Sequence, residues 1–192
     1  MSALSKVMLI RHAEKPDPKG DAPHGVTADG ERHEGSLTVR GWQRAGALVG
    51  LFAPSDQIFI SPHLATPSVI YASGPRGGSQ RPLETILPLE NRVRAKVVKS
   101  FTKGDESELA RAVSQEGGVV LICWQHERIF EIATHLTANA PPEAPIPEEW
   151  PPERFDVVWI FTPPAVGTGA RHWTFSQVPQ ELLDGDVQTV IS

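Results

Sequence analysis

Short apolar segments recur along this 192-residue chain, and they constrain its fold more than any other feature. Each has the length of a β-strand and carries no charged residue, and the first is typical of strands buried within a parallel sheet. They lie at residues 7–10, 69–72, 119–124 and 157–161. Segments with helical features lie between them, as expected when helices cover both faces of such a sheet. The sequence therefore predicts an α/β protein, a three-layer α/β/α sandwich with a central, mostly parallel sheet.

The predicted helices have either a start signal or an apolar face. They begin near Thr38, Pro82, Asp105 and Glu127. Thr38 is of a residue type that caps helix N-termini, and Asp105 with Glu108 resembles a capping box. Two further short strands are expected at residues 96–98 and around residues 173–178. The alternation of strands and helices thus continues along most of the chain.

Two irregular segments interrupt a chain whose length favours a single domain, residues 1–192. Residues 15–36 are rich in Pro, Gly, Asp and His and have no periodicity, so they form a predicted loop insertion. Loops of this length inside compact domains are often functional lids. Residues 140–152 are rich in proline and are expected to form a surface connection.

Charge and hydropathy argue against several classes of partner. The net charge of −5 disfavours nucleic acid, because proteins that bind it usually carry a basic face. No apolar run reaches the ~20 residues of a membrane-spanning helix, and the N-terminal run is shorter than the core of a secretory signal. The single cysteine, Cys123, excludes an internal disulfide framework. We therefore expect a cytoplasmic protein without a nucleic-acid or membrane partner; the sequence leaves its oligomeric state open.

Basic residues follow three of the apolar segments, at the point where each segment ends. Arg11 and His12 follow the first segment, Arg81 lies in the turn after the second, and His126 follows the third. Because the carboxyl ends of parallel strands meet at one edge of a sheet, we expect these side chains to converge on one pocket. Two guanidinium groups roughly match a phosphate monoester, which carries about −1.5 to −2 charges at neutral pH. Arg76 is a rival for the second arginine, although the context of Arg81 fits better.

The same arginines bear on the protonation of His12. A histidine nucleophile must be neutral at the attacking nitrogen, and its unperturbed pKa is about 6.5. Nearby positive charge disfavours the imidazolium form and so keeps His12 available for attack.

These motifs resemble those of the histidine phosphatase superfamily, the group that includes the phosphoglycerate mutases and many phosphatases. Four segments carry the resemblance: the Arg-His-x-Glu motif, the Leu-Thr-x-x-Gly-x-x-x-Ala helix start, the second-arginine motif and the second-histidine strand end. They are similar to residues 11–14, 37–45, 79–85 and 124–127, respectively, of this chain. The resemblance covers roughly residues 5–137, in the family's order.

The resemblance implies a role for each basic residue. His12 is expected to be the nucleophile that becomes a phosphohistidine, while Arg11, Arg81 and His126 hold the phosphoryl oxygens and stabilise the transition state. We also expect Thr38 among the substrate-binding residues, and Glu14 as the partner of an arginine. No metal and no cofactor is expected, because the arginines and His126 supply the positive charge.

The proton donor for the leaving group is less well defined. Mutase-like members carry a carboxylate in a Glu-x-x-Gly pattern after the third strand, whereas residues 101–104 of this chain contain none. The candidates are Asp105 and Glu106 just beyond, and Glu127, which adjoins His126 as the acid does in the family's phytase-like branch. A proton donor is worth about 10²–10⁴ in rate. We favour Glu127 slightly and count it among the catalytic residues.

The favoured function is that of a phosphomonoester hydrolase, a metal-independent histidine phosphatase that acts through a phosphohistidine on His12. Its expected substrate is a small phosphorylated molecule or a phosphoprotein. Three alternatives stay open: a phosphotransferase of the phosphoglycerate mutase type, a protein phosphohistidine phosphatase, and a non-catalytic phosphate-binding module. A phosphohistidine substrate has a phosphoramidate bond, which needs less help from an acid. The sequence does not identify the substrate.

Overall fold

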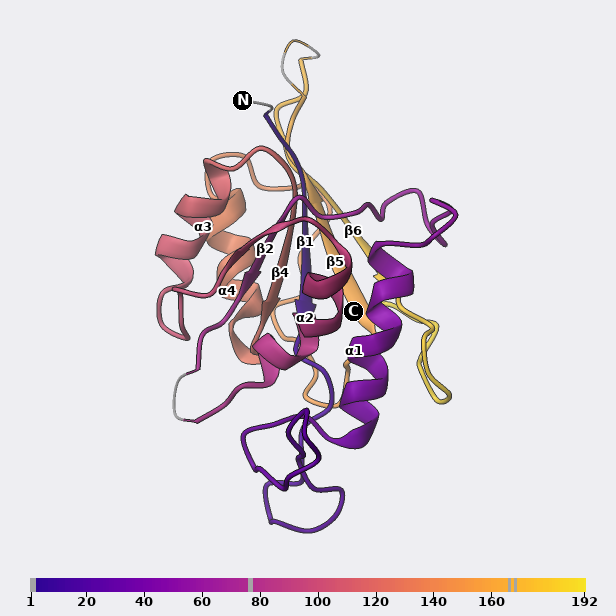
Figure 1. The fold of residues 1–192 in the computed structure, drawn as a ribbon. Helices are drawn as coiled ribbons and strands as arrows, with labels where there is room; N and C mark the ends of the chain where they lie inside the picture. The colour runs from indigo at the N-terminus through magenta and orange to yellow at the C-terminus, as the bar shows by residue number, and fades with distance from the viewer. Residues whose placement is uncertain (1–2, 76–77, 166, 168) are drawn as a thin grey trace.

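A central β-sheet with helices on both faces forms the protein (Figure 1). The structure is a computed structural model that describes residues 3–75, 78–165, 167 and 169–192. Within these ranges the sheet has six strands in the order β3-β2-β4-β1-β5-β6. The strands are β1 (Leu4–Arg11), β2 (Val69–Ala72), β3 (Lys96–Val98), β4 (Gly118–Trp124), β5 (Val157–Thr162) and β6 (Thr174–Pro179). All six strands predicted from the sequence are therefore present.

The sheet is mixed rather than mostly parallel. Strands β1 to β4 pair in parallel, whereas β5 runs antiparallel to both of its neighbours, β1 and β6. The cause is the connection before β5: residues 138–156 contain no crossover helix and return to the edge of the sheet where β1 ends. A strand that starts from that edge must run antiparallel to β1. The expected α/β sandwich is thus confirmed, with a correction to its sheet.

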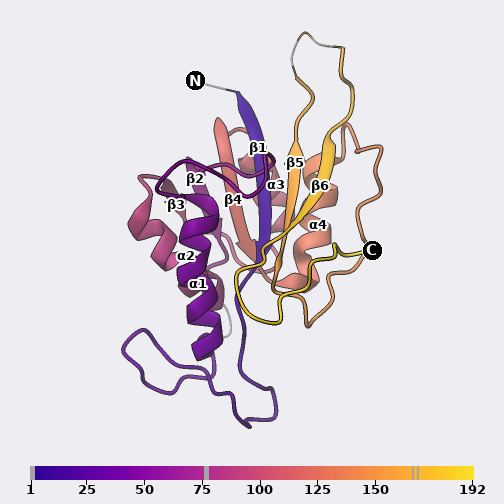
Figure 2. The ribbon, with the colours of Figure 1, turned by 90° about the vertical axis from the view of Figure 1, so that its right-hand side faces the viewer.

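Alternate residues of each strand face two different helical layers, which Figure 2 shows on either side of the sheet. The helices are α1 (Val39–Phe52), α2 (Arg81–Arg92), α3 (Glu106–Ser114) and α4 (His126–Thr137). Val7 and Leu9 of β1 belong to the core cluster that includes residues of α3 and α4. Met8 and Ile10 belong to the cluster that includes residues of α1 and α2. No helix in the described ranges has the length and hydropathy needed to span a bilayer.

The helix starts follow the sequence in all but one detail. The Thr38 hydroxyl accepts a hydrogen bond from the N–H of Gly41, as an N-cap does, and a proline occupies the first turn of α2. The expected capping box at Asp105 is wrong. Its carboxylate accepts hydrogen bonds from the N–H and hydroxyl of Thr102 and makes no cap bond to α3. The side chain therefore stabilises the preceding turn.

Candidate active site

The edge where β1 and β4 end brings together residues that lie far apart in the sequence. β1 ends at Arg11, and the N–H of His12 donates to the carbonyl of Trp124 at 3.0 Å. The end of β1 therefore lies beside the end of β4, and His126, the first residue of α4, follows β4 after one intervening residue. Beyond this edge lies the loop of residues 15–36 (Figure 1).

Helix α2 brings the second arginine to the same edge. The N–H of Ala13 donates to the hydroxyl of Thr85 at 2.9 Å, which ties the segment after β1 to the first turns of α2. Arg81 is the first residue of that helix, and its Nη1 donates to the carbonyl of Glu34 at 3.2 Å. Its Nε is buried and has no hydrogen-bond partner among the described residues. Arg76, the rival for this role, lies outside the described residues.

His12 is held as a neutral imidazole with one nitrogen free. Its side chain is buried, and its Nδ1 lies 2.8 Å from the carbonyl of Ala13. Because a carbonyl can only accept, Nδ1 carries the proton and Nε2 keeps its lone pair. Burial, and then the charges of Arg11 and Arg81, lower the pKa of His12 to about 3. The expectation from the arginines is supported, and burial adds a larger effect.

Residues 151–155 surround the Arg11 guanidinium group, and we call this segment the Arg11 cradle; the sequence did not predict it. Its Nη1 donates to the carbonyls of Pro151, Pro152 and Arg154. The ring of Phe155 lies against the guanidinium group, 3.7 Å from its Cζ. Nε and Nη2 of Arg11 are buried and lack partners within the described ranges. One edge of the guanidinium is therefore anchored, and the other is left to bind an anion in bidentate fashion.

The carboxylate of Glu127 lies beside His126 but is already ion-paired. Its Oε1 lies 2.5 Å from Nζ of Lys103. Its Oε2 lies 3.0 Å from Nδ1 of His126, a pair without good hydrogen-bond geometry. His126, and then Lys103, hold the pKa of Glu127 well below its usual range. The side chain is therefore ionised at neutral pH, which is the wrong state for a proton donor.

The other two acid candidates hold the backbone in place. The buried carboxylate of Glu106 accepts hydrogen bonds from the N–H of Gly104 and from the indole N–H of Trp124, the latter at 3.0 Å. The carboxylate of Asp105 accepts from Thr102 in the preceding turn. Both carboxylates act as hydrogen-bond acceptors in these contacts.

Thr38 and Glu14 lie one step away from the phosphoryl site. The Thr38 hydroxyl caps α1 and donates to the carbonyl of Glu14 at 3.3 Å, so substrate binding by Thr38 stays a prediction. The Glu14 carboxylate lies 2.8 Å from Nη2 of Arg44 and 3.3 Å from Nε of Arg40. The expectation that Glu14 pairs with an arginine is confirmed.

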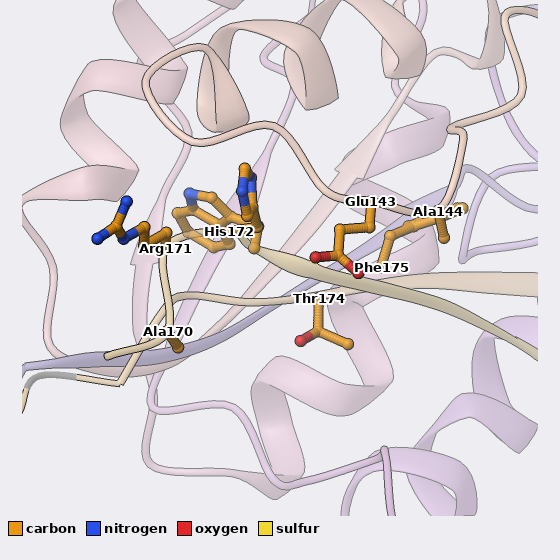
Figure 3. Close-up of a pocket in the computed structure, with 8 residues that line it drawn as sticks. Glu143, Ala144, Ala170, Arg171, His172, Thr174 and Phe175 are labelled. Carbon is orange, nitrogen blue, oxygen red and sulfur yellow. The ribbon is translucent and has the colours of Figure 1, made fainter. Parts of the chain in front are cut away.

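Two pockets help to place the substrate. One, of about 550 Å³, lies against Arg81 and is lined by residues 15–20, Arg32 and Glu34. The other, of about 340 Å³, lies near the start of β6 at the opposite edge of the sheet, and its lining includes Arg171 and His172 (Figure 3). Arg81 is the one predicted site residue that lines the first pocket, and none of the predicted site residues lines the second. No group of three or more His, Cys, Asp or Glu among the described residues is arranged to hold a metal ion.

Solved structures of histidine phosphatases have a fold similar to that of this chain. No protein-family model and no curated protein matches the sequence. The protein histidine phosphatase SixA complexed with tungstate matches with a TM-score of 0.51 and 14% identity, over 91% of this chain and 97% of that chain. A candidate phosphohistidine phosphatase SixA from Agrobacterium tumefaciens matches with a TM-score of 0.50 and 13% identity, over 91% of this chain and 97% of that chain. A candidate phosphohistidine phosphatase SixA from Nakamurella multipartitia matches with a TM-score of 0.54 and 16% identity, over 90% of this chain and 93% of that chain. The resemblance seen in the motifs is confirmed at the level of the fold.

Proposed function

We propose that this protein is a phosphatase that passes the phosphoryl group of its substrate first to His12 and then to water. The observation that carries the proposal is the state of His12, a buried neutral imidazole with Nε2 free, beside two arginines with unpartnered N–H groups. A neutral Nε2 can attack phosphorus, and the free edges of Arg11 and Arg81 can bind the phosphoryl oxygens. A purely structural histidine would not need this arrangement.

The reaction has two steps. In the first, Nε2 of His12 forms a bond to phosphorus while the bond from phosphorus to the leaving group breaks. In the second, water attacks the phosphohistidine, which releases inorganic phosphate and restores the neutral imidazole. Arg11, Arg81 and His126 offset the negative charge that builds on the phosphoryl oxygens, so the proposal requires no metal. Tungstate, present in the matched SixA structure, is a tetrahedral oxyanion like phosphate and supports oxyanion binding by this fold.

One observation favours a phosphohistidine as the substrate over an alkyl phosphate. The neighbours of Glu127 lower its pKa, and Asp105 and Glu106 accept hydrogen bonds from Thr102 and Gly104, so none of the three carboxylates is placed to give a proton to the leaving group. Alkyl phosphates depend strongly on such an acid, because the leaving alkoxide must be protonated. The imidazole of a phosphohistidine leaves with less help. We therefore propose a protein phosphohistidine as the preferred substrate, in line with the names of the matched structures.

Hydrolysis of 4-nitrophenyl phosphate in EDTA tests the proposed reaction. Its leaving group needs little acid assistance, so the wild type is expected to turn over, and His12→Ala to be inactive. His135→Ala on the exposed side of α4 serves as the matched histidine control and is expected to keep full activity. Brief incubation with ³²P-labelled substrate should trap an acid-labile phosphoenzyme in the wild type only. An active His12→Ala, or activity that EDTA abolishes and a metal restores, would contradict the proposal.

A second assay tests the substrate class. The rate with a phosphohistidine peptide is compared with the rate for the matching phosphoserine peptide at neutral pH. We expect the phosphohistidine peptide to react at least a hundredfold faster, because the lack of a general acid lowers the rate by about 10²–10⁴. Equal rates would show that a proton donor is present and would favour a general phosphomonoesterase.

A further inference from the structure

Among the described residues, two of the six lysines of this chain have no hydrogen-bond or ion-pair partner for their ammonium group, and both line the same pocket. The ammonium groups of the other four each contact a carboxylate or a carbonyl oxygen. These are Lys6, Lys96, Lys99 and Lys103. Within the described ranges, the ammonium groups of Lys15 and Lys19 have no hydrogen bond and no ion pair. The lysines without partners are therefore concentrated at one place, beside Arg81.

This pocket shares one residue with the proposed phosphoryl site. Arg81 belongs to both, and Lys15 lies only three residues after the proposed nucleophile, His12. The charges of Arg11 and Arg81 act on Lys15 and, after burial, help to lower its pKa. Because Arg81 lines this pocket of about 550 Å³, a substrate whose phosphoryl group binds Arg81 has its remaining part near the pocket.

The pocket carries an excess of positive charge that its own acids do not balance. Glu34 is paired with Arg32 at 3.1 Å. The carboxylate of Asp17 accepts a hydrogen bond from the backbone N–H of Lys19 at 2.7 Å and leaves the ammonium group of that lysine unpaired. Lys15, Lys19 and Arg81, whose Nε has no partner among the described residues, therefore line one pocket, and their charge favours an anion there.

We propose that this pocket is a subsite for a second anionic group of the substrate, and that Lys15 and Lys19 bind it. The inference rests on the proposed function, since it places the phosphoryl group at His12. The recognised chemistry is a carboxylate or a phosphate close to the transferred phosphoryl group. In a phosphohistidine protein, a neighbouring Asp or Glu side chain would supply it.

Calorimetric binding of non-hydrolysable ligands tests the subsite without depending on turnover. The probes are phosphonoacetate and 3-phosphonopropionate, each compared with its own carboxamide, which has the same size but no second charge. We expect the wild type to bind the better carboxylate about tenfold more tightly than its amide, and Lys15→Met and Lys19→Met each to reduce that ratio about two- to fivefold, as for partly exposed ion pairs. Lys99→Met, which removes a lysine paired with Glu90, is the control and should leave the ratio unchanged.

The source of the second anion is tested with two phosphohistidine peptides, one with aspartate and one with asparagine next to the phosphohistidine. A preference for aspartate that the lysine variants lose assigns the subsite to a protein substrate, whereas a preference confined to the phosphonates assigns it to a small molecule. Ratios near one for both phosphonates and both peptides in a folded wild type would overturn the inference. If the wild type does not hydrolyse 4-nitrophenyl phosphate, the proposed function is overturned. The subsite is then decided by the binding ratios alone, because they do not depend on turnover.

Discussion

Replacing Phe155 by leucine tests how the protein holds Arg11 in place. The ring lies 3.7 Å from the Arg11 Cζ and covers one face of a guanidinium group that is only 1% exposed. Leucine keeps an apolar side chain there but removes the flat ring face and its attraction for a cation. The hydrogen bonds from Nη1 to its carbonyl acceptors are kept, so the variant loses the contact that orients the guanidinium plane but keeps the contacts that hold Arg11 in place.

The structure sets the expected size of the effect. A desolvated cation–π contact is worth about 2 kcal/mol, so the free energy of unfolding should fall by about that amount. If a reoriented Arg11 loses one charge-assisted hydrogen bond to the bound anion, the binding free energy falls by about 1.5–3 kcal/mol. At ~1.4 kcal/mol per tenfold, tungstate should bind roughly ten- to a hundredfold more weakly.

The assay measures the tungstate dissociation constant and kcat/KM for 4-nitrophenyl phosphate, with the unfolding free energy measured in parallel. Phe175→Leu is the matched control, because the Phe175 ring packs on Trp159 and Phe161 and has no contact with Arg11. It should lose stability without losing tungstate affinity, while Phe155→Trp should largely restore binding. Unchanged tungstate binding in Phe155→Leu, or an equal loss in Phe175→Leu, would refute the reasoning.

Three further predictions concern charge. Glu127→Gln should raise kcat/KM for 4-nitrophenyl phosphate severalfold, because it removes a carboxylate beside a bound anion. Steady-state kinetics measure this ratio, and a 10²–10⁴-fold fall would instead identify Glu127 as the acid. His12 has a pKa of about 3 when folded and about 6.5 when unfolded, so the unfolded chain gains the proton first as pH falls. Urea unfolding should show the wild type losing stability relative to His12→Asn by up to about 1.4 kcal/mol per pH unit from pH 6.5 to 3, and a constant difference would argue against that pKa. Asp186→Ala removes a carboxylate 2.7 Å from the buried Arg44 and should lower the free energy of unfolding by about 3–5 kcal/mol in the same assay; a loss below 1 kcal/mol would show that Glu14 suffices.

Local signals made most of the fold predictable. A strand that ends in Arg11-His12, a capping Thr38 and a proline in the first turn of α2 are each encoded within a few residues. The direction of β5 is not encoded in that way, because an apolar run such as residues 157–161 shows that a strand is buried but not which way it runs. That direction depends on the path of residues 138–156, which have no periodic pattern.

The supporting parts of the site were harder to predict than the basic residues themselves. Arg11 meets its carbonyl acceptors about 140 positions further along the chain, and no motif links the two. The pairing of Glu127 with Lys103 likewise joins a helix start to a turn, and together with the larger effect of His126 it lowers the pKa of that carboxylate. Charge balance in a pocket depends on which groups have partners, and only the three-dimensional structure shows that.

The central place of β1 in the sheet has a consequence for the making of the protein. β1 precedes the other five described strands of the sheet in the chain, yet Met8 pairs with Leu121 on one side and with Ile160 on the other. During synthesis β1 is thus apolar and unpaired until β4 and β5 have been made, and such non-local pairing is slow to form. A nascent chain that stops before Phe155 also lacks the last part of the Arg11 cradle. We therefore expect activity only after residues 151–155 have been synthesised, and the shorter nascent chain to need protection from aggregation until then.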